Sequence, residues 1–362
     1  MKKTNYMTMA KAIGIILVVV GHSGAPKALV QFIYLFHMPL FFFISGYFYN
    51  DKYSVDPVTL IKKRLNSLYK PFLIYEVIFL LLHNLFFKFN LYSTTVMYGN
   101  KFIQAYSGGQ FIKEFIKIVL FAGREPIVGV FWFFTSLFFV NVIFCCFSYL
   151  IEKMFSKNKE YTRAFCIIAI FIMANLATKY GFNISRFNNS LSMVLVYYLG
   201  YLFKRHEKDF EMCNIYFVGI SLLLLSTSCI YGSVDVGLNS YLSPDFLIIN
   251  SILGIYLILS LSKYIVKKDV LQSKLLYYIG NNTIVIMALQ FLSFKLVILL
   301  QIKINSLPIE SLAKFPVLNG ANGWWILYTI VGVFVPIGIK YIFDSLNGKI
   351  NIIKLNSNTT QY

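Results

Sequence analysis

The chain has 362 residues, of which 58% are hydrophobic, 18% aromatic and only 13% charged. A soluble domain is roughly 25% charged, so the composition excludes an ordinary soluble protein and predicts an all-α polytopic membrane protein. The net charge of +18 does not indicate a nucleic-acid partner, because the basic residues form short clusters between apolar runs. The lipid bilayer and anionic molecules at its cytoplasmic face are the expected partners.

The apolar runs predict ten transmembrane helices, since each crossing needs about 20 apolar residues. They are expected at 7–24, 29–49, 71–89, 127–150, 163–180, 190–203, 213–231, 245–262, 276–298 and 324–344. The basic residues gather in alternate loops, which places both termini in the cytoplasm. Residues 1–345 are expected to form one membrane domain and residues 346–362 a short cytoplasmic tail. No small-residue cleavage site follows the first run, so it is interpreted as a retained span.

The first predicted span carries two ionisable side chains, Lys11 and His22. They are separated by nearly three helical turns, so they face the same side, roughly 16 Å apart along the helix axis. Such side chains are costly inside a membrane and usually functional. Two interpretations stay open: Lys11 could snorkel to the head groups and His22 could be structural, or the pair marks the two ends of a site.

The second predicted span contains the run His37-Met38-Pro39-Leu40-Phe41-Phe42-Phe43-Ile44-Ser45-Gly46. His37 could make a structural hydrogen bond, and Ser45 and Gly46 could simply allow close helix approach. Because the costly polar residues concentrate in the first two spans, we expect them to form a functional site there.

Basic residues precede the third predicted span. Arg64 and Lys70 could anchor the chain at the inner surface, or they could bind phosphates, for which Arg offers a bidentate contact and Lys a point charge. Glu76, inside that span, requires a partner.

The outer segment from 90 to 126 contains an amphipathic pattern, with apolar residues at helical spacing between 111 and 119. A helix in the membrane interface is expected, either as a surface segment without chemistry or as a roof over an acceptor groove. Arg124 and Glu125 follow it and could form an ion pair at the membrane edge. Trp132 is expected near the outer end of the fourth span.

Several classes of site are absent from the sequence. There is no phosphate-binding glycine loop, no G-x-S-x-G nucleophile elbow and no zinc-ligand spacing, so a soluble kinase or hydrolase mechanism and a metal centre are not expected. The five cysteines lie mostly in or beside apolar runs and are interpreted as small buried hydrophobes.

The sequence resembles the membrane acyltransferase-3 family over nearly its whole length. Lys11, ten residues and His22 resemble its Arg/Lys-x10-His signature, and Phe36 to Tyr47 resembles its second-span motif, the most specific part of the match. Weaker likenesses are Arg64 to Phe72, Phe131-Trp132-Phe133-Phe134, Leu199-Gly200-Tyr201 and Ile279-Gly280-Asn281-Asn282-Thr283. The branch of fucose 4-O-acetylase fits best. Gln290 departs from the family, which often has a histidine there.

The resemblance implies an O-acyltransferase of the bacterial cytoplasmic membrane, which transfers acetyl from acetyl-CoA to a hydroxyl of a cell-surface or exported glycan. No permanently bound cofactor is expected, acetyl-CoA being a co-substrate, and a homo-oligomer is left open. Under this hypothesis His22 is the general base or transient acyl carrier. The remaining candidates are His37 and Arg124 for catalysis, Lys11, Arg64 and Lys70 for the donor, and Ser45, Glu76, Glu125 and Trp132 for the acceptor.

Two alternatives belong to other functional classes. A transporter or flippase of a lipid-linked glycan would use the same aromatic groove without CoA. A receptor or structural membrane partner would leave the intramembrane polar residues without a role.

Some family members also carry an extracytoplasmic hydrolase-like domain, which is not expected here because the sequence ends soon after the last span.

Overall fold

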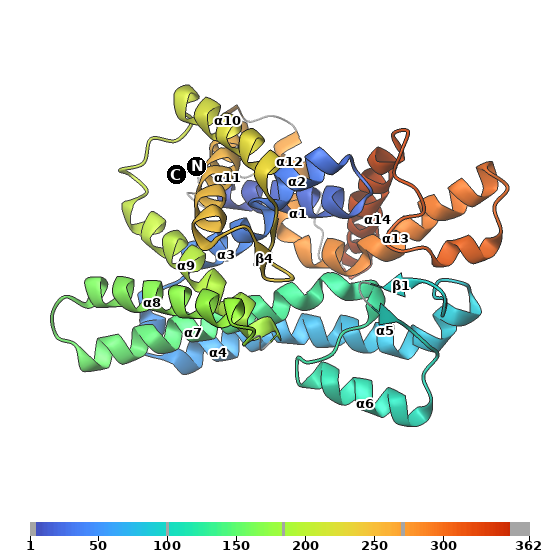
Figure 1. Ribbon diagram of the computed structural model, residues 1–362, viewed down its shortest axis with the longest axis horizontal. Coiled ribbons are helices and arrows are strands. Elements are labelled where there is room, and N and C mark those ends of the chain that lie inside the picture. The colour runs from blue at the N-terminus through green and yellow to red at the C-terminus, as the bar shows by residue number, and fades with distance from the viewer. Residues whose placement is uncertain (1–4, 99–100, 183–184, 269–271, 348–362) are drawn as a thin grey trace.

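The computed structural model describes residues 5–98, 101–182, 185–268 and 272–347. Over these residues the fold is a bundle of helices with two short antiparallel hairpins (Figure 1). Seven of the described helices are long and apolar enough to cross a membrane, and two shorter apolar helices cover Tyr6–His22 and Ile215–Tyr231. The predicted class, an all-α polytopic membrane protein, is confirmed. The predicted tail lies almost wholly outside the described residues.

The first half of the chain forms the helices that carry most of the candidate residues. They are α1 (Asn5–His22), α2 (Lys27–Tyr34), α3 (His37–Tyr47), the 3₁₀ turn η1 (Asp51–Ser54), α4 (Pro57–Arg64), the π-helical turn η2 (Leu65–Tyr69), α5 (Lys70–Lys88), α6 (Gly108–Val119), the 3₁₀ turn η3 (Pro126–Phe131) and α7 (Trp132–Met154). Strands β1 (Met97–Tyr98) and β2 (Lys101–Phe102) pair antiparallel between α5 and α6.

The second half completes the bundle. Its elements are α8 (Lys159–Lys179), α9 (Ser185–His206), α10 (Ile215–Tyr231), β3 (Val234–Asp235), β4 (Ser240–Tyr241), α11 (Pro244–Lys268), α12 (Gln272–Asn281), α13 (Thr283–Ile304), the 3₁₀ turn η4 (Ile309–Ala313) and α14 (Trp324–Leu346). Strands β3 and β4 form a hairpin with Val234 opposite Tyr241. The predicted span 190–203 lies within α9.

The third predicted span, 71–89, corresponds to α5 (Lys70–Lys88), but the helix begins earlier than predicted, because α4 and η2 lead into α5 without a break and make one helix from Pro57 to Lys88. Asp56 starts it by accepting a hydrogen bond from the Thr59 backbone N–H at 3.2 Å, as an N-cap does. The basic cluster 62–64 is therefore helical and not a loop. Since α4 and η2 pack against α7, and Tyr75 contacts Phe131 just before α7, the part of α5 after Tyr75 lies beyond the start of α7.

The ninth predicted span, 276–298, is also displaced, because the chain breaks between α12 and α13. Asn282 leaves helical geometry (φ −118°, ψ 28°), and its side-chain amide donates to the Tyr278 carbonyl at 2.9 Å. Asparagine readily makes such local bonds, which compete with the helix. The apolar helix therefore starts at Thr283.

The expected amphipathic helix in the outer segment is confirmed as α6. Ser107 and Gln110 form a reciprocal capping box at its start, which satisfies two otherwise unpaired backbone donors. Ile112, Phe115 and Ile116 stay exposed, as a helix at a membrane interface requires. Figure 1 shows α6 alongside α5, against which it packs, and its interpretation as a roof over an acceptor groove stays a prediction.

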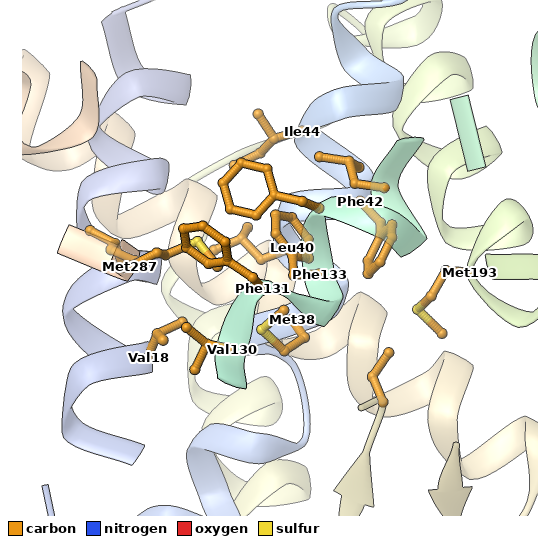
Figure 2. Close-up of a cluster of buried hydrophobic side chains, with 14 of the residues drawn as sticks. Val18, Met38, Leu40, Phe42, Ile44, Val130, Phe131, Phe133, Met193 and Met287 are labelled. Atoms are coloured by element: carbon orange, nitrogen blue, oxygen red, sulfur yellow. The ribbon is translucent and has the colours of Figure 1, made fainter. Parts of the chain in front are cut away.

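The hydrophobic core holds the first two spans together. Figure 2 shows buried side chains from α1, α3, the η3–α7 segment, α9 and α13 that converge on one cluster. Its labelled members are Val18, Met38, Leu40, Phe42, Ile44, Val130, Phe131, Phe133, Met193 and Met287. Because Val18 lies one turn before His22 and Met38 adjoins His37, this core fixes the positions of both histidines.

Candidate functional site

His22 is the last residue of α1 and His37 the first residue of α3, and the two interact electrostatically with each other. The His37 Nδ1 lies 2.9 Å from the Ile33 carbonyl oxygen. A carbonyl can only accept, so Nδ1 carries the proton and the neutral ring presents a lone pair at Nε2. His37 is 4% exposed, whereas His22 is partly accessible and contacts Phe291 edge-on, with ring centroids 5.2 Å apart. The structure therefore brings the histidines of the first two predicted spans near each other, and their functional roles stay predictions.

Two further groups lie near these histidines, Tyr34 at the end of α2 and Asp235 in the β3–β4 hairpin. Tyr34 lies beside His37, with ring centroids 4.8 Å apart, and Asp235 acts electrostatically on Tyr34. Trp132 reaches the same hairpin, since a Cβ atom on Gly237 would lie 3.0 Å from the indole Cε2. Sequence reasoning missed Tyr34 and Asp235, because the contact of a hairpin with a helix 200 residues away leaves no local signal.

A second polar group lies deeper, between α3, α4, α7 and α9. The Tyr197 hydroxyl donates to Asn141 Oδ1 at 2.9 Å, and the Asn141 amide lies 3.2 Å from Ser45 Oγ. Arg64 interacts with the Tyr197 hydroxyl, and its buried Nε has no partner among the described residues. The structure therefore brings Arg64 and Ser45 into one group and leaves a guanidinium N–H free for an anion.

The sequence names Lys70 together with Arg64 as candidate phosphate ligands, but the structure gives the two side chains different surroundings. Lys70 is exposed, whereas the Arg64 Nε is buried, and the π turn η2 lies between the two residues. Lys11 is half-buried in α1 and makes no hydrogen bond or ion pair within the described part of the chain. Its basic group therefore stays available.

Arg124, Glu125 and Glu76 form a third group, on the part of α5 beyond α7. The Glu125 backbone N–H donates to Glu76 Oε2 at 2.7 Å, and Arg124 Nη1 donates to the Gly129 carbonyl at 3.3 Å. Glu125 Oε2 lies 2.8 Å from Nδ1 of His83, a residue that the sequence analysis did not single out. These residues hold the η3 turn, and the predicted catalytic role of Arg124 stays a prediction.

The His83–Glu125 pair shares a proton. His83 Nε2 lies 3.0 Å from the Gln104 carbonyl and must donate to it, so the Nδ1 contact needs a second proton, from either the imidazolium or the carboxylic acid. Burial raises the pKa of the Glu125 carboxyl above its ordinary value, although the hydrogen bond to His83 opposes this shift. The pair is a buried, proton-holding contact between α5 and the outer segment.

Ring contacts connect this outer group to His22. His83 contacts Tyr92, Tyr92 contacts Tyr98, and Tyr98 contacts Phe315, with centroids 5.0–5.2 Å apart. Phe315 in turn lies 4.8 Å from Phe291, the neighbour of His22. The outer segment and the 305–323 loop thus form an aromatic wall beside the end of α1.

One signal could have found His83 from the sequence, since it stands in an apolar run like His22 and His37.

Gln290 is fully buried, and neither its amide oxygen nor its nitrogen has a partner among the described residues. Such an unpaired amide is costly. The described residues contain no group of three or more His, Cys, Asp or Glu side chains that could hold a metal ion.

The fold and these groups define a polytopic membrane protein. It has paired histidines at one end of its first two spans, and nearer the other end of these spans it has the Arg64 guanidinium, whose Nε has no partner among the described residues. Residues 4–341 match the family model described as "Acyltransferase domain", that of the acyltransferase-3 family. The chain therefore belongs to this family of membrane acyltransferases. Comparisons with curated proteins and with solved structures find no significant match.

Family membership confirms the predicted class of activity, an acyltransferase, and does not favour a glycan transporter. The narrower likeness to the fucose 4-O-acetylase branch stays a prediction.

Proposed function

We propose that this protein is an O-acetyltransferase of the bacterial cytoplasmic membrane, which uses cytoplasmic acetyl-CoA to acetylate a hydroxyl of a cell-surface or exported glycan. The observation that carries this proposal is the pair His22–His37 on α1 and α3, inside a chain of the acyltransferase-3 family. Acyl transfer to a hydroxyl needs a base that removes the hydroxyl proton, and a neutral histidine provides one near physiological pH.

The donor site is proposed at the deeper polar group. Arg64 offers a buried N–H without a partner among the described residues, and Lys11 offers a half-buried ammonium. Both suit the phosphates of coenzyme A. Ser45, joined to Arg64 through Asn141 and Tyr197, would orient the pantetheine arm on its way towards the histidines.

The chemical step is proposed at the outer end of α1. The hydroxyl oxygen of the sugar attacks the thioester carbonyl carbon, His22 takes the hydroxyl proton, and the carbon–sulfur bond breaks to release the thiol, which receives that proton. His22 is assigned as the base because it is partly accessible, whereas His37 is 4% exposed. His37 Nε2 would accept a hydrogen bond from the incoming hydroxyl. Asp235 and Trp132 would contact the sugar.

The test is the His22→Ala variant in the host cell. We expect loss of about 10²–10⁴ of the acetylation rate, measured as glycan O-acetate by NMR at equal membrane abundance. His206→Ala is the matched control, since His206 is exposed and pairs only with nearby Asp209 at 3.3 Å. Unchanged O-acetate in the His22 variant would overturn the mechanism.

A further inference from the structure

Two adjoining cavities lie on the side of the bundle away from the outer group. The first, of about 570 Å³, lies between α9 and α11 and is floored by Phe43 of α3. The second, of about 600 Å³, lies among Lys263, Lys267, Lys268 and the 212–213 turn. Met212 lines both, so an apolar cavity and a basic cavity adjoin at this residue.

The apolar part is suited to a hydrocarbon chain. Its walls include Leu202, Phe203, Ile255 and Leu259, and its volume is in the range of ordinary ligand pockets, roughly 300–1,000 Å³. It opens sideways, because Ile252 on its rim is 48% exposed on an apolar helix that is long enough to cross the membrane. A cavity open on the lipid-facing side of a membrane helix takes its occupant from the bilayer.

The basic part lacks anionic partners within the described residues, which exclude 269–271. Lys263 and Lys268 lie over the rings of Tyr6 and Tyr264, at 5.2 and 5.0 Å from their centroids. None of the three lysines forms an ion pair with a described carboxylate.

The nearby carboxylates are already engaged. Glu207 accepts hydrogen bonds from the Tyr6 and Tyr47 hydroxyls at 2.7 and 2.9 Å. Asp209 pairs with His206, and Glu211 accepts from Asn214 at 3.1 Å. Among the described residues, none of these carboxylates lies within ion-pair distance of the three lysines, so their ammonium groups can bind an anionic ligand.

We propose that this double cavity binds one anionic phospholipid of the cytoplasmic leaflet. Its phosphate would lie among Lys263, Lys267 and Lys268, and one acyl chain would fill the space between α9 and α11. Basic pockets between membrane helices on the cytoplasmic side suit anionic head groups. The site also has a wall in common with the proposed transferase, since Phe43 and Ser45 are two residues apart on α3, so the lipid would stabilise the helix that carries His37.

The wall between the two parts is held by the 207–214 turn. The Cys213 backbone N–H donates to Ser260 Oγ at 3.3 Å, and the Tyr256 hydroxyl donates to the Glu211 carbonyl at 3.1 Å. These bonds tie the turn to α11, so the relative position of head group and chain is fixed by the fold. A free phosphate-bearing cofactor would use the lysines but would leave the lateral apolar cavity empty.

The experiment measures lipid binding directly, by native mass spectrometry of the purified full-length protein in detergent. Phosphatidylglycerol is added in parallel with phosphatidylcholine of the same chain length. We expect one preferred phosphatidylglycerol per protein. Because each lysine near a lipid surface contributes roughly fivefold, the variant K263Q/K267Q/K268Q should bind about a hundredfold more weakly.

Two further variants keep the test decisive. K62Q/K153Q/K157Q removes the same charge elsewhere on the predicted cytoplasmic side and should bind as the wild type does. Ile252→Trp, which fills the lateral opening without a change in charge, should also weaken binding. Equal binding of the two lipids, unchanged binding by the K263Q/K267Q/K268Q variant, or displacement of the lipid by coenzyme A would overturn the proposal. The readout is independent of acetyl transfer, so its failure would leave the proposed function untouched.

Discussion

The tautomer of His37 is fixed by a single backbone contact. Its Nδ1–H donates to the carbonyl four residues earlier, at Ile33. An asparagine makes the same kind of bond elsewhere in the chain, from Asn141 to the Leu137 carbonyl at 2.7 Å. The hydrogen bond and the free Nε2 lone pair of His37 can therefore be separated by mutation.

His37→Asn is expected to keep the bond to Ile33 and to lose the Nε2 acceptor. Acetylation should fall about ten- to hundredfold, the worth of one hydrogen bond in a transition state, with little change in melting temperature. His37→Phe should lose the same activity and also about 1 kcal/mol of stability, the worth of the lost side-chain hydrogen bond, while the Ile33 carbonyl still accepts from the Phe36 backbone N–H at 3.2 Å. Steady-state rates and thermal unfolding of the two purified variants check this. A loss larger than that of His22→Ala would make His37 the base.

The sequence predicted some residues of the candidate site and missed others. His22 and His37 were found because a titratable group in an apolar run is conspicuous. Tyr34, Asp235 and Tyr197 were not, because a tyrosine or a loop aspartate is common and only the fold brings them to the site. The exposed position of Lys70 suits the alternative that it anchors the chain at the membrane surface, and its role in donor binding stays a prediction.

At the scale of elements, Pro71 accounts for the π turn before it. Proline has no N–H to bond the Ser67 carbonyl, and its ring collides with that carbonyl in a regular helix. The wider η2 turn, Leu65–Tyr69, avoids the collision and lets the helix continue to Lys88. The sequence had predicted the start of a helix at Pro71. Because of the π turn, the basic cluster before this proline and the apolar segment after it belong to one helix instead.

Two glycines from the predicted motifs meet where α3 crosses α9. A Cβ atom on Gly46 would lie 1.8 Å from the Tyr197 carbonyl oxygen, and one on Gly200 would lie 2.0 Å from the Phe43 carbonyl oxygen. Small residues at helix interfaces allow such close approach. The alternative of a packing role for Gly46 is supported, and Leu199-Gly200-Tyr201 gains the same explanation.

Gly200→Ala should push α9 away from α3 and lower the free energy of unfolding by about 1–3 kcal/mol, the usual cost of overpacking. Gly219→Ala in α10 is the control, since no heavy atom would lie within 4 Å of its new Cβ. Thermal unfolding in detergent compares the two. Equal melting temperatures for both variants would contradict the close packing of α3 on α9.

For the whole molecule, the apolar runs predicted the class and most of the spans, because each must bury about 20 residues in lipid. Helix breaks within such runs were missed, as at Asn282 between α12 and α13. The charge pattern further predicts that the β3–β4 hairpin is outside the cell and the α7–α8 turn inside.

This orientation can be measured in a variant without native cysteines. Leu238, 64% exposed in the hairpin, and Lys157, exposed in the α7–α8 turn, are each replaced by cysteine. A membrane-impermeant maleimide should label Leu238→Cys in intact spheroplasts and Lys157→Cys only after permeabilisation. The reverse pattern would invert the proposed route from donor to acceptor.

The central claim is that acetyl passes from acetyl-CoA to a glycan hydroxyl at His22. It is tested most directly by purified protein in lipid vesicles, supplied with radiolabelled acetyl-CoA and with host polysaccharide stripped of its O-acetyl groups by mild alkali. The account predicts labelled polysaccharide with the wild type and His206→Ala, and none above background with His22→Ala. Absence of label with the wild type, or equal labelling by His22→Ala, would contradict it.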